Sequence, residues 1–210
     1  MHLDRIDTYA RRMIRRPITS LALLAAILAG CSAAGIEVPG SDERATADTG
    51  RVVKVADGDT ITVRLADGDQ KVRLLGIDSP ESSALRYGAP DCGGKQAKSK
   101  MLALVFSDPV DSDGDGLFDR KGGTGRTVTL TTDPTQDRVD RYERLLAYAS
   151  LAGSDTTLQQ SMLAAGLAEV YVFNKPFERL EAFERSAQRG RDAGRGVYGA
   201  CGGDFHSSQD

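Results

Sequence analysis

Acidic residues and one arginine lie in two short stretches of the sequence, at 57–60 and 72–81. Asp57 and Asp59 belong to an Asp-Gly turn, while Arg73, Asp78 and Glu81 belong to the run "VRLLGIDSPE". Carboxylates are the ligands that hard divalent cations prefer. An arginine beside them adds little to a purely structural metal site, but its guanidinium can hold a phosphate through two hydrogen bonds. The residue types therefore indicate metal-assisted chemistry on a phosphate group.

Each of these features also has a simpler interpretation. Asp-Gly pairs most often mark turns. An arginine near a glutamate at the end of a strand is most often a surface ion pair that contributes little stability. The chemical interpretation is favoured only if the fold brings the residues of both stretches together.

The elements that must position these residues are short strands. Runs rich in Val, Ile, Leu and Thr, separated by turn residues, predict strands at 51–56, 60–65, 71–77, 126–133 and 144–151. Pro80 should end the third strand and fix the turn that presents Asp78 and Glu81.

Helical patterns occupy residues 95–106, 156–170 and 176–191. Thr156 and Gln159 are spaced for a capping box, and Pro176 suits the first turn of the last helix. Five short strands and three helices predict an α+β, mainly β fold, in which the strands close into an OB-type barrel.

The N-terminus has the pattern of an export signal. Five arginines precede an apolar run, Ile18–Gly30, and Cys31 follows. The run is short for a membrane span, which takes about 20 residues. Leu-Ala-Gly-Cys resembles the bacterial lipobox, which implies cleavage before Cys31, lipidation of its thiol and attachment to the outer face of the cell membrane. An ordinary secretory signal and an uncleaved anchor are the alternatives.

The chain then divides into a signal peptide at 1–30, a small and polar tether at 31–49, and one domain at 50–205. The formal net charge is −3 and becomes −6 without the signal, which carries five Arg and two Asp. An acidic protein does not favour broad, non-specific capture of nucleic acid. Any affinity for a polyanion must come from a focused basic site or from a metal.

Two cysteines remain for the folded domain, Cys92 and Cys201. An exported protein meets an oxidising environment, so a disulfide is the default expectation. It would close a loop of roughly 110 residues and contribute about 4 kcal/mol in the chain-entropy model. Two free buried thiols are the alternative.

Four stretches, "DGDT", "VRLLGIDSPE", "DRYERLLAY" and "GLAEV", follow one another at 57–60, 72–81, 140–148 and 166–170. They resemble the motifs of the staphylococcal-nuclease-like thermonucleases, and the resemblance covers about residues 51–199. It implies an OB barrel with three helices and a monomer that hydrolyses phosphodiester bonds of DNA and RNA with calcium. It also implies products that end in 3′-phosphate and 5′-hydroxyl, and we expect single-stranded substrate to be favoured.

The resemblance assigns the calcium ligands to the carboxylates of Asp59 and Asp78 and to the backbone carbonyl of Ser79, which replaces the family's usual threonine. Glu81 would position or deprotonate the attacking water.

Arg73 and Arg144 would bind the scissile phosphate, and Arg141 and Tyr142 would lie along the substrate. A cation with two guanidinium groups stabilises the charge that builds up on the phosphate more than it stabilises the ground state.

Two positions depart from the family pattern. Glu143 stands where the family commonly has glycine, and it would either repel phosphate or point outward. The aromatic residues after "GLAEV" are shifted by one, at Tyr171 and Phe173. Their rings would stack on nucleotide bases or pack the barrel, and packing is the favoured interpretation.

A competing function is a binding module, in which the same barrel holds nucleic acid or protein without cutting it. A calcium-binding surface lipoprotein with an adhesive or structural role is a further alternative. A degenerate copy should have lost part of the catalytic set, and none is lost here: Asp59, Arg73, Asp78, Glu81 and Arg144 are all present.

An insertion at 107–125 contains the stretch "DSDGDGLFDR". Asp111, Asp113 and Asp115 match positions 1, 3 and 5 of an EF-hand loop, Leu117 would supply a carbonyl, and Asp119 would take position nine. Gly122 replaces the glutamate of position twelve. The stretch predicts a second, structural calcium site, and a solvated acidic loop is the alternative.

Overall fold

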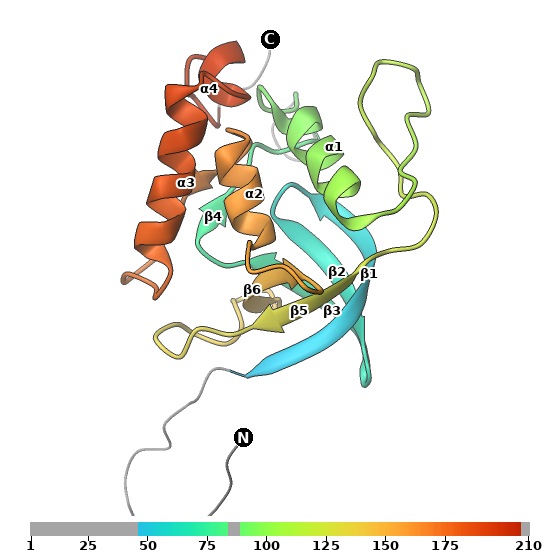
Figure 1. Cartoon of the computed structure of the whole chain (residues 1–210), viewed down its shortest axis with the longest axis vertical. Coiled ribbons are helices and arrows are strands. Elements are labelled where there is room, and N and C mark those ends of the chain that lie inside the picture. The colour runs from blue at the N-terminus through green and yellow to red at the C-terminus, as the bar shows by residue number, and fades with distance from the viewer. Residues whose placement is uncertain (1–45, 84–88, 207–210) are drawn as a thin grey trace, which may run out of the picture. The chain divides into compact units, whose positions relative to one another are not determined.

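A computed structural model describes residues 46–83 and 89–206 (Figure 1). The expected signal peptide at 1–30, Cys31 and nearly all of the expected tether at 31–49 lie outside the described residues. Among the helices of the described part, none is long and apolar enough to cross a membrane.

Five strands close into a barrel in the order β1-β2-β3-β6-β5. The strands are β1 (Ala47–Asp57), β2 (Thr60–Leu65), β3 (Gly68–Leu74), β5 (Thr127–Thr131) and β6 (Leu145–Leu151). Neighbours are antiparallel except β3 and β6, which run parallel. The predicted fold class, an α+β, mainly β protein with a five-stranded OB-type barrel, is confirmed.

The alternation of apolar residues along the strands explains the barrel. Val52, Ile61, Val63, Val72 and Leu74 point inward and are buried, while their polar neighbours are more exposed. β1 begins before the expected domain boundary at residue 50 because its first residues pair with β5, starting with Ala47 opposite Thr131. The strand expected at 126–133 is shortened to Thr127–Thr131.

The strand expected at 71–77 is interrupted. A turn at Leu75-Gly76 separates β3 from the short β4 (Ile77–Asp78), which pairs with β7 (Glu169–Val170) in a separate two-stranded sheet. Gly76 has φ 82°, and a Cβ there would clash with the Phe177 ring. The turn redirects the chain so that Asp78 lies opposite Glu169.

Helices α1 (Gly94–Val105), α2 (Leu158–Ala164), α3 (Leu180–Asp192) and α4 (Val197–Ala200) gather at one end of the barrel (Figure 1). The expected helix at 156–170 was too long, because Gly166 takes a left-handed φ of 67° and the chain continues into β7. Its capping box is formed by Thr157 and Gln160, so the assignment to Thr156 and Gln159 was wrong by one residue.

The last long helix begins at Leu180, so the prediction that Pro176 opens it was wrong. Residues 178–179 form a turn instead, because Phe177 is buried against the rings of Tyr148 and Phe183. The short helix α4 was not predicted.

A buried carboxylate, Asp133, ties the barrel to this turn. It accepts hydrogen bonds from the Thr135 amide and hydroxyl, from the Glu178 amide at 2.8 Å and from the Tyr148 hydroxyl. Burial opposes ionisation, yet the hydrogen bonds from Thr135 and Tyr148 hold the pKa of Asp133 below its usual value. Burial and the Asp133 carboxylate raise the pKa of Tyr148 well above its ordinary range.

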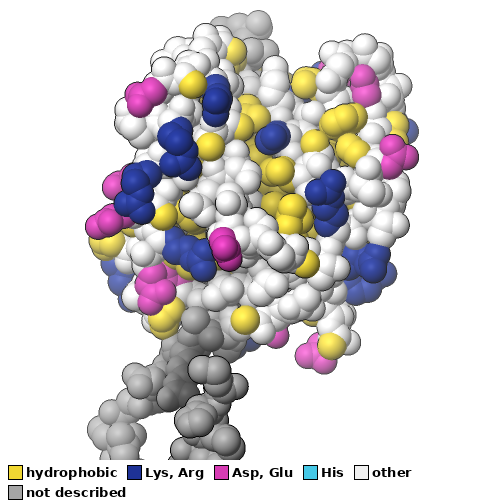
Figure 2. Space-filling model, in the orientation of Figure 1, with side chains coloured by type: hydrophobic (Ala, Val, Ile, Leu, Met, Phe, Trp, Pro, Cys, Tyr) yellow, Lys and Arg dark blue, Asp and Glu magenta, His cyan; other side chains and the backbone are white. Residues whose placement is uncertain are grey.

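A disulfide joins Cys92, two residues before the start of α1, to Cys201, directly after α4, with Cα atoms 6.0 Å apart. The connection between α1 and β5 extends from the barrel as a long loop (Figure 1). On the face drawn in Figure 2, the described basic side chains are interspersed with acidic ones. This face therefore has mixed charge.

Candidate active site

The two stretches of acidic residues meet at one end of the barrel. Asp59 lies in the turn between β1 and β2, and its carbonyl accepts a hydrogen bond from the Leu74 amide at 2.8 Å. Arg73 forms an ion pair with Asp59 and a second with Asp78, where Nη2 lies 2.5 Å from Oδ1. One guanidinium therefore bridges two carboxylates that are far apart in the sequence.

The chain around Ser79 locks the Asp59 carboxylate in place. Asp59 Oδ2 accepts hydrogen bonds from the Ser79 amide at 2.9 Å and from the Ser79 hydroxyl at 3.0 Å, and the Thr60 hydroxyl donates to Oδ1. Gly58 allows this approach, since a Cβ there would lie 2.8 Å from the Ser79 hydroxyl. Asp59 is buried as a result.

Asp57 and Glu81 add two more carboxyl groups next to this cluster. Burial and the neighbouring Glu81 raise the pKa of Asp57 to about 7. Asp57 Oδ1 also accepts hydrogen bonds from the Gly58 amide and from the Ser82 amide at 3.2 Å. With Asp59 and Asp78, these groups form a carboxyl-rich end of the barrel whose chemistry suits a hard divalent cation.

Arg144 lies just before β6 and is held by Asp140. Arg144 Nε donates to Asp140 Oδ2 at 2.7 Å, and the backbone amides of Tyr142 and Arg144 both donate to Oδ1. Partial burial opposes ionisation, yet these bonds to Arg144 and Tyr142 keep the pKa of Asp140 below its usual value. Glu143, in the middle of this loop, is exposed and has a left-handed φ of 61°.

The left-handed backbone at Glu143 explains why glycine suits this position. The exposed ring of Tyr142 lies under two guanidinium groups, with centroid distances of 4.8 Å to Arg141 and 5.3 Å to Arg144. Cationic and aromatic surface is thus presented together on one loop.

A cleft of about 710 Å³ extends from the end of β3 to the loop that carries Arg144. Its lining includes Arg73, Asp78 and Arg144, together with Tyr171 and Phe173.

The favoured expectation that Tyr171 and Phe173 pack the barrel was wrong. Tyr171 is 44% exposed and Phe173 73% exposed, with their ring centroids 6.4 Å apart. The reason is that β7 ends at Val170, and the Tyr171 amide bonds to the Gly76 carbonyl at 3.0 Å at the rim of the barrel.

Asp91 supports the loop that carries Glu81. The Glu81 amide donates to Asp91 Oδ2 at 3.0 Å, and the Asp91 amide donates to the Glu81 carbonyl at 3.0 Å. Asp91 was not singled out from the sequence, because its spacing from Glu81 follows no regular element.

The C-terminal segment brings a histidine to the same end of the barrel. His206 Nε2 lies 3.1 Å from Glu169 Oε1 and 3.6 Å from Asp78 Oδ2, and Nδ1 lies 3.9 Å from Asp91 Oδ2. His206 is one of two histidines in the chain and lies beyond the stretch that resembles the family, so sequence reasoning missed it.

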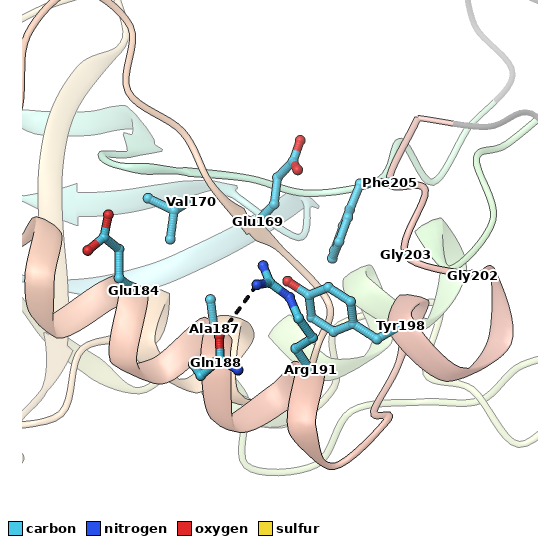
Figure 3. Close-up of a pocket in the computed structure, with 10 residues that line it drawn as sticks. All are labelled: Glu169, Val170, Glu184, Ala187, Gln188, Arg191, Tyr198, Gly202, Gly203 and Phe205. Carbon is cyan, nitrogen blue, oxygen red and sulfur yellow. Dashed lines mark hydrogen bonds between the residues drawn. The ribbon is translucent and has the colours of Figure 1, made fainter.

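A cavity of about 760 Å³ separates this C-terminal segment from α3 (Figure 3). Phe205 is buried and packs edge-on against Tyr198 at 5.2 Å between centroids, and the Arg191 guanidinium lies 5.3 Å from the Tyr198 ring. These contacts fasten the segment that carries His206.

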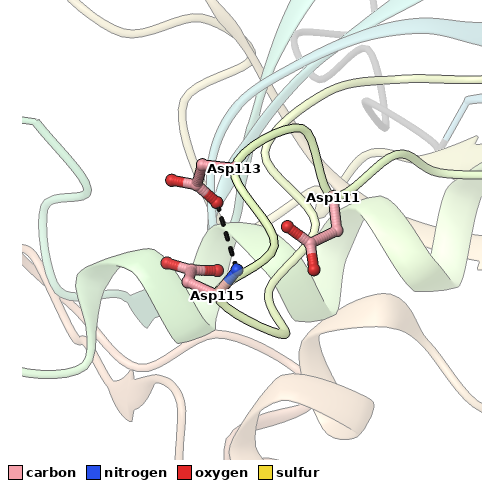
Figure 4. A group of neighbouring side chains, drawn as sticks. All are labelled: Asp111, Asp113 and Asp115. Carbon is pink, nitrogen blue, oxygen red and sulfur yellow. Dashed lines mark hydrogen bonds between the residues drawn. The ribbon is translucent and has the colours of Figure 1, made fainter.

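The Asp-rich loop lies beside α1, where Lys95 Nζ lies 3.7 Å from Asp115 Oδ2. Oxygen atoms of Asp111, Asp113 and Asp115 lie within 4.8 Å of one another (Figure 4). The Asp111 carboxylate accepts the amides of Gly114 and Gly116 at 2.8 and 2.9 Å.

The fourth expected carboxylate ligand of this loop, Asp119, is not part of the group. Asp119 accepts hydrogen bonds from the Ser112 amide at 3.1 Å and from its hydroxyl at 2.5 Å. The Leu117 amide donates to Asp115 at 2.9 Å. The structure thus gathers three of the four expected carboxylate ligands, and the Leu117 carbonyl stays a prediction.

Residues 71–198 match the family model described as "Staphylococcal nuclease homologue". The chain belongs to the staphylococcal nuclease family. Arg73, Asp78, Glu81 and Arg144 fall inside the matched segment, and Asp59 precedes it.

Several relatives support this membership. The chain is 31% identical over 155 residues to an uncharacterized protein of Methanocaldococcus jannaschii, covering 68% of this chain and 69% of the relative. It is 30% identical over 151 residues to a micrococcal nuclease of Shigella flexneri, covering 68% and 70%. It is 28% identical over 149 residues to a thermonuclease of Staphylococcus hyicus, covering 69% and 74%.

Proposed function

We propose that this member of the staphylococcal nuclease family is a calcium-dependent nuclease that cuts DNA or RNA by attack of water at phosphorus. Hydrolysis of phosphodiester bonds follows from the family and from relatives that are themselves nucleases. The observation that carries the finer proposal is the bridge from Arg73 to Asp59 and Asp78 at the edge of the cleft.

Asp59, Asp78 and the Ser79 carbonyl would hold the calcium ion. The set fits, because oxygen ligands are what calcium takes. Burial and the neighbouring Glu81 carboxyl group raise the pKa of Asp57 to about 7 beside these ligands. When bound, calcium supplies positive charge to the phosphate and a site for water.

Arg73 and Arg144 stabilise the developing charge on the phosphate. A guanidinium group that is already oriented needs little reorganisation when that charge appears. Arg73 is oriented by Asp59 and Asp78, and Arg144 by Asp140. Glu81 positions the attacking water or takes its proton. The bond from phosphorus to the 5′-oxygen breaks and a proton is delivered to that oxygen, so that the products end in 3′-phosphate and 5′-hydroxyl.

Single-stranded substrate is favoured by the exposed rings along the cleft. Tyr142, Tyr171 and Phe173 present aromatic surface on which unpaired bases can stack. Arg141, above the Tyr142 ring, adds positive charge beside it. Base stacking and local charge suit a protein with an acidic net charge, since they do not require a broad basic surface.

We further propose that the protein acts outside the cytoplasm, as a monomer anchored through lipid on Cys31 or secreted. The Cys92–Cys201 disulfide supports this proposal, because such bonds persist in oxidising compartments. The Asp111, Asp113 and Asp115 group would take a second, structural calcium ion that stiffens the inserted loop.

The test is cleavage of a labelled single-stranded DNA and a matched RNA by the purified protein in calcium, followed by addition of chelator. The proposal expects cleavage that the chelator stops and that magnesium does not restore fully. Glu81→Gln should lower turnover at least about a hundredfold while the protein stays folded. Binding of the DNA without cutting would instead identify a binding module.

A further inference from the structure

We propose that Asp91, held by the Cys92–Cys201 disulfide, is a positioning residue for Glu81. The inference rests on the proposed function, in which Glu81 acts on the attacking water. It assigns a catalytic purpose to an acidic residue and a disulfide that lie outside the set of ligands and phosphate-binding arginines.

Asp91 satisfies both backbone polar groups of Glu81. Its carboxylate accepts the Glu81 amide, and its own amide donates to the Glu81 carbonyl, both at 3.0 Å. Such a paired contact fixes the position and the orientation of the Glu81 peptide units. Their orientation in turn decides where the Glu81 side chain points.

Glu81 needs such support because no regular element holds it. It lies in a loop that follows Pro80, and it is exposed. The next residue, Ser82, is bonded through its amide to Asp57. The short stretch from Pro80 to Ser82 is therefore held by contacts with Asp57 and Asp91 rather than by a strand ladder.

Asp91 is itself anchored from two sides. Its carbonyl accepts the Gly94 amide at 3.0 Å, where α1 begins. The following residue, Cys92, is joined to Cys201 at the end of α4. Gly94 also lies against the Glu81 carbonyl, where any Cβ would clash. Helices α1 and α4 are thus connected to Glu81 through the short segment from Asp91 to Gly94.

The Asp91 carboxylate also faces His206, whose Nδ1 lies 3.9 Å away. A variant of Asp91 can therefore change charge as well as hydrogen bonding. Asp91→Asn separates the two effects, because the amide oxygen can still accept the Glu81 amide while the charge is lost. Asp91→Ala removes both.

The experiment measures kcat and KM on single-stranded DNA in calcium for the wild type, Asp91→Ala, Asp91→Asn and Glu81→Gln, and for Asp91→Ala combined with Glu81→Gln. Asp91→Ala should lower kcat by about tenfold to a hundredfold, since displacements of about 1 Å have effects of this size. KM should stay within about twofold, and Asp91→Asn should recover most of the lost kcat.

The variant that combines Asp91→Ala with Glu81→Gln distinguishes a positioning role from a purely structural one. If Asp91 acts through Glu81, Asp91→Ala should have no further effect on the residual activity of Glu81→Gln. Cys92→Ser with Cys201→Ser should likewise lower kcat in the wild type, at a temperature where the variant is folded, and not in the Glu81→Gln protein. Asp69→Ala, in an exposed ion pair with Arg64, serves as the matched control.

A wild-type kcat in Asp91→Ala would overturn the inference. So would an equal loss in Asp91→Asn, or an undiminished effect in the Glu81→Gln background, while the wild type still cuts and the proposed function stands. A wild type that does not cut, or a Glu81→Gln protein with full activity, would overturn the proposed mechanism and this inference with it.

Discussion

The Asp140 carboxylate binds both the side chain and the backbone amide of Arg144. Oδ2 accepts a hydrogen bond from the guanidinium Nε at 2.7 Å, and Oδ1 accepts one from the Arg144 amide at 2.9 Å. The guanidinium is therefore fixed relative to its own main chain at the rim of the cleft.

This arrangement predicts that Arg144→Lys is nearly as damaging as Arg144→Ala. An ammonium group on a flexible stem cannot reproduce the planar donor set that Asp140 orients. Both variants should lower kcat/KM for single-stranded DNA by at least about a hundredfold, and thermal unfolding should report intact folding. A lysine variant with wild-type activity would show that only the charge of Arg144 matters.

Substitutions in the Asp-rich loop should affect stability, and substitutions in the carboxyl-rich end of the barrel should affect catalysis. Asp113→Asn with Asp115→Asn should reduce the rise in melting temperature that calcium produces, because stabilisation depends on ligand binding to the native state. kcat should change little. Asp59→Asn should lower kcat and change the calcium-dependent rise in melting temperature little, since Asp59 forms an ion pair with Arg73 at the cleft. Loss of cleavage in a folded Asp113 and Asp115 double variant would contradict this division.

Asp133 should make stability depend on pH in the acid range. The hydrogen bonds it accepts lower its pKa in the folded protein, against about 3.9 in the unfolded chain. Its contribution is therefore complete above about pH 5 and is lost as the pH falls through the folded pKa.

Asp133→Asn provides the measurement. Its amide NH₂ group would face the donors of Glu178 or Thr135, so unfolding in urea at pH 7 should show a loss of about 2–3 kcal/mol. The difference from wild type should shrink below about pH 4. A difference that is constant from pH 7 to pH 3 would refute the role of the charge.

Glu143→Gly should raise the free energy of unfolding. The left-handed φ of 61° costs a residue with a Cβ about 1 kcal/mol or more, and glycine avoids this cost but loses some of the gain to greater freedom when unfolded. We expect a net increase of about 0.5 kcal/mol by denaturant titration. Glu143→Ala, which keeps the strain, is the control, and an equal effect of both variants would exclude backbone strain.

The sequence was sufficient for the barrel, because alternation along the strands follows directly from which residues, such as Val63 and Val72, must face inward. It was also sufficient to expect Asp59, Arg73 and Asp78 at one end, since their motifs flank the strand termini. The predicted helix boundaries were wrong where tertiary contacts determine the structure. Because Phe177 is buried, α3 begins at Leu180 and not at residue 176.

The support around the site was not predictable from local pattern. Asp91 binds the backbone amide of Glu81, and His206 lies near the Asp78 carboxylate, yet spacing along the chain gives no sign of either contact. The exposure of Tyr171 and Phe173 depends on a two-residue strand that is too short to detect by periodicity. These are long-range relationships that only the folded chain defines.

The disulfide also gives the molecule a covalent ring. Its sulfurs join residues 109 positions apart, and that interval contains the exposed loop between α1 and β5. A protease that cuts within this loop would open the ring without dividing the molecule, because the pieces on either side of the cut would stay joined through Cys92 and Cys201. A nicked protein would migrate as two fragments only after a reductant is added.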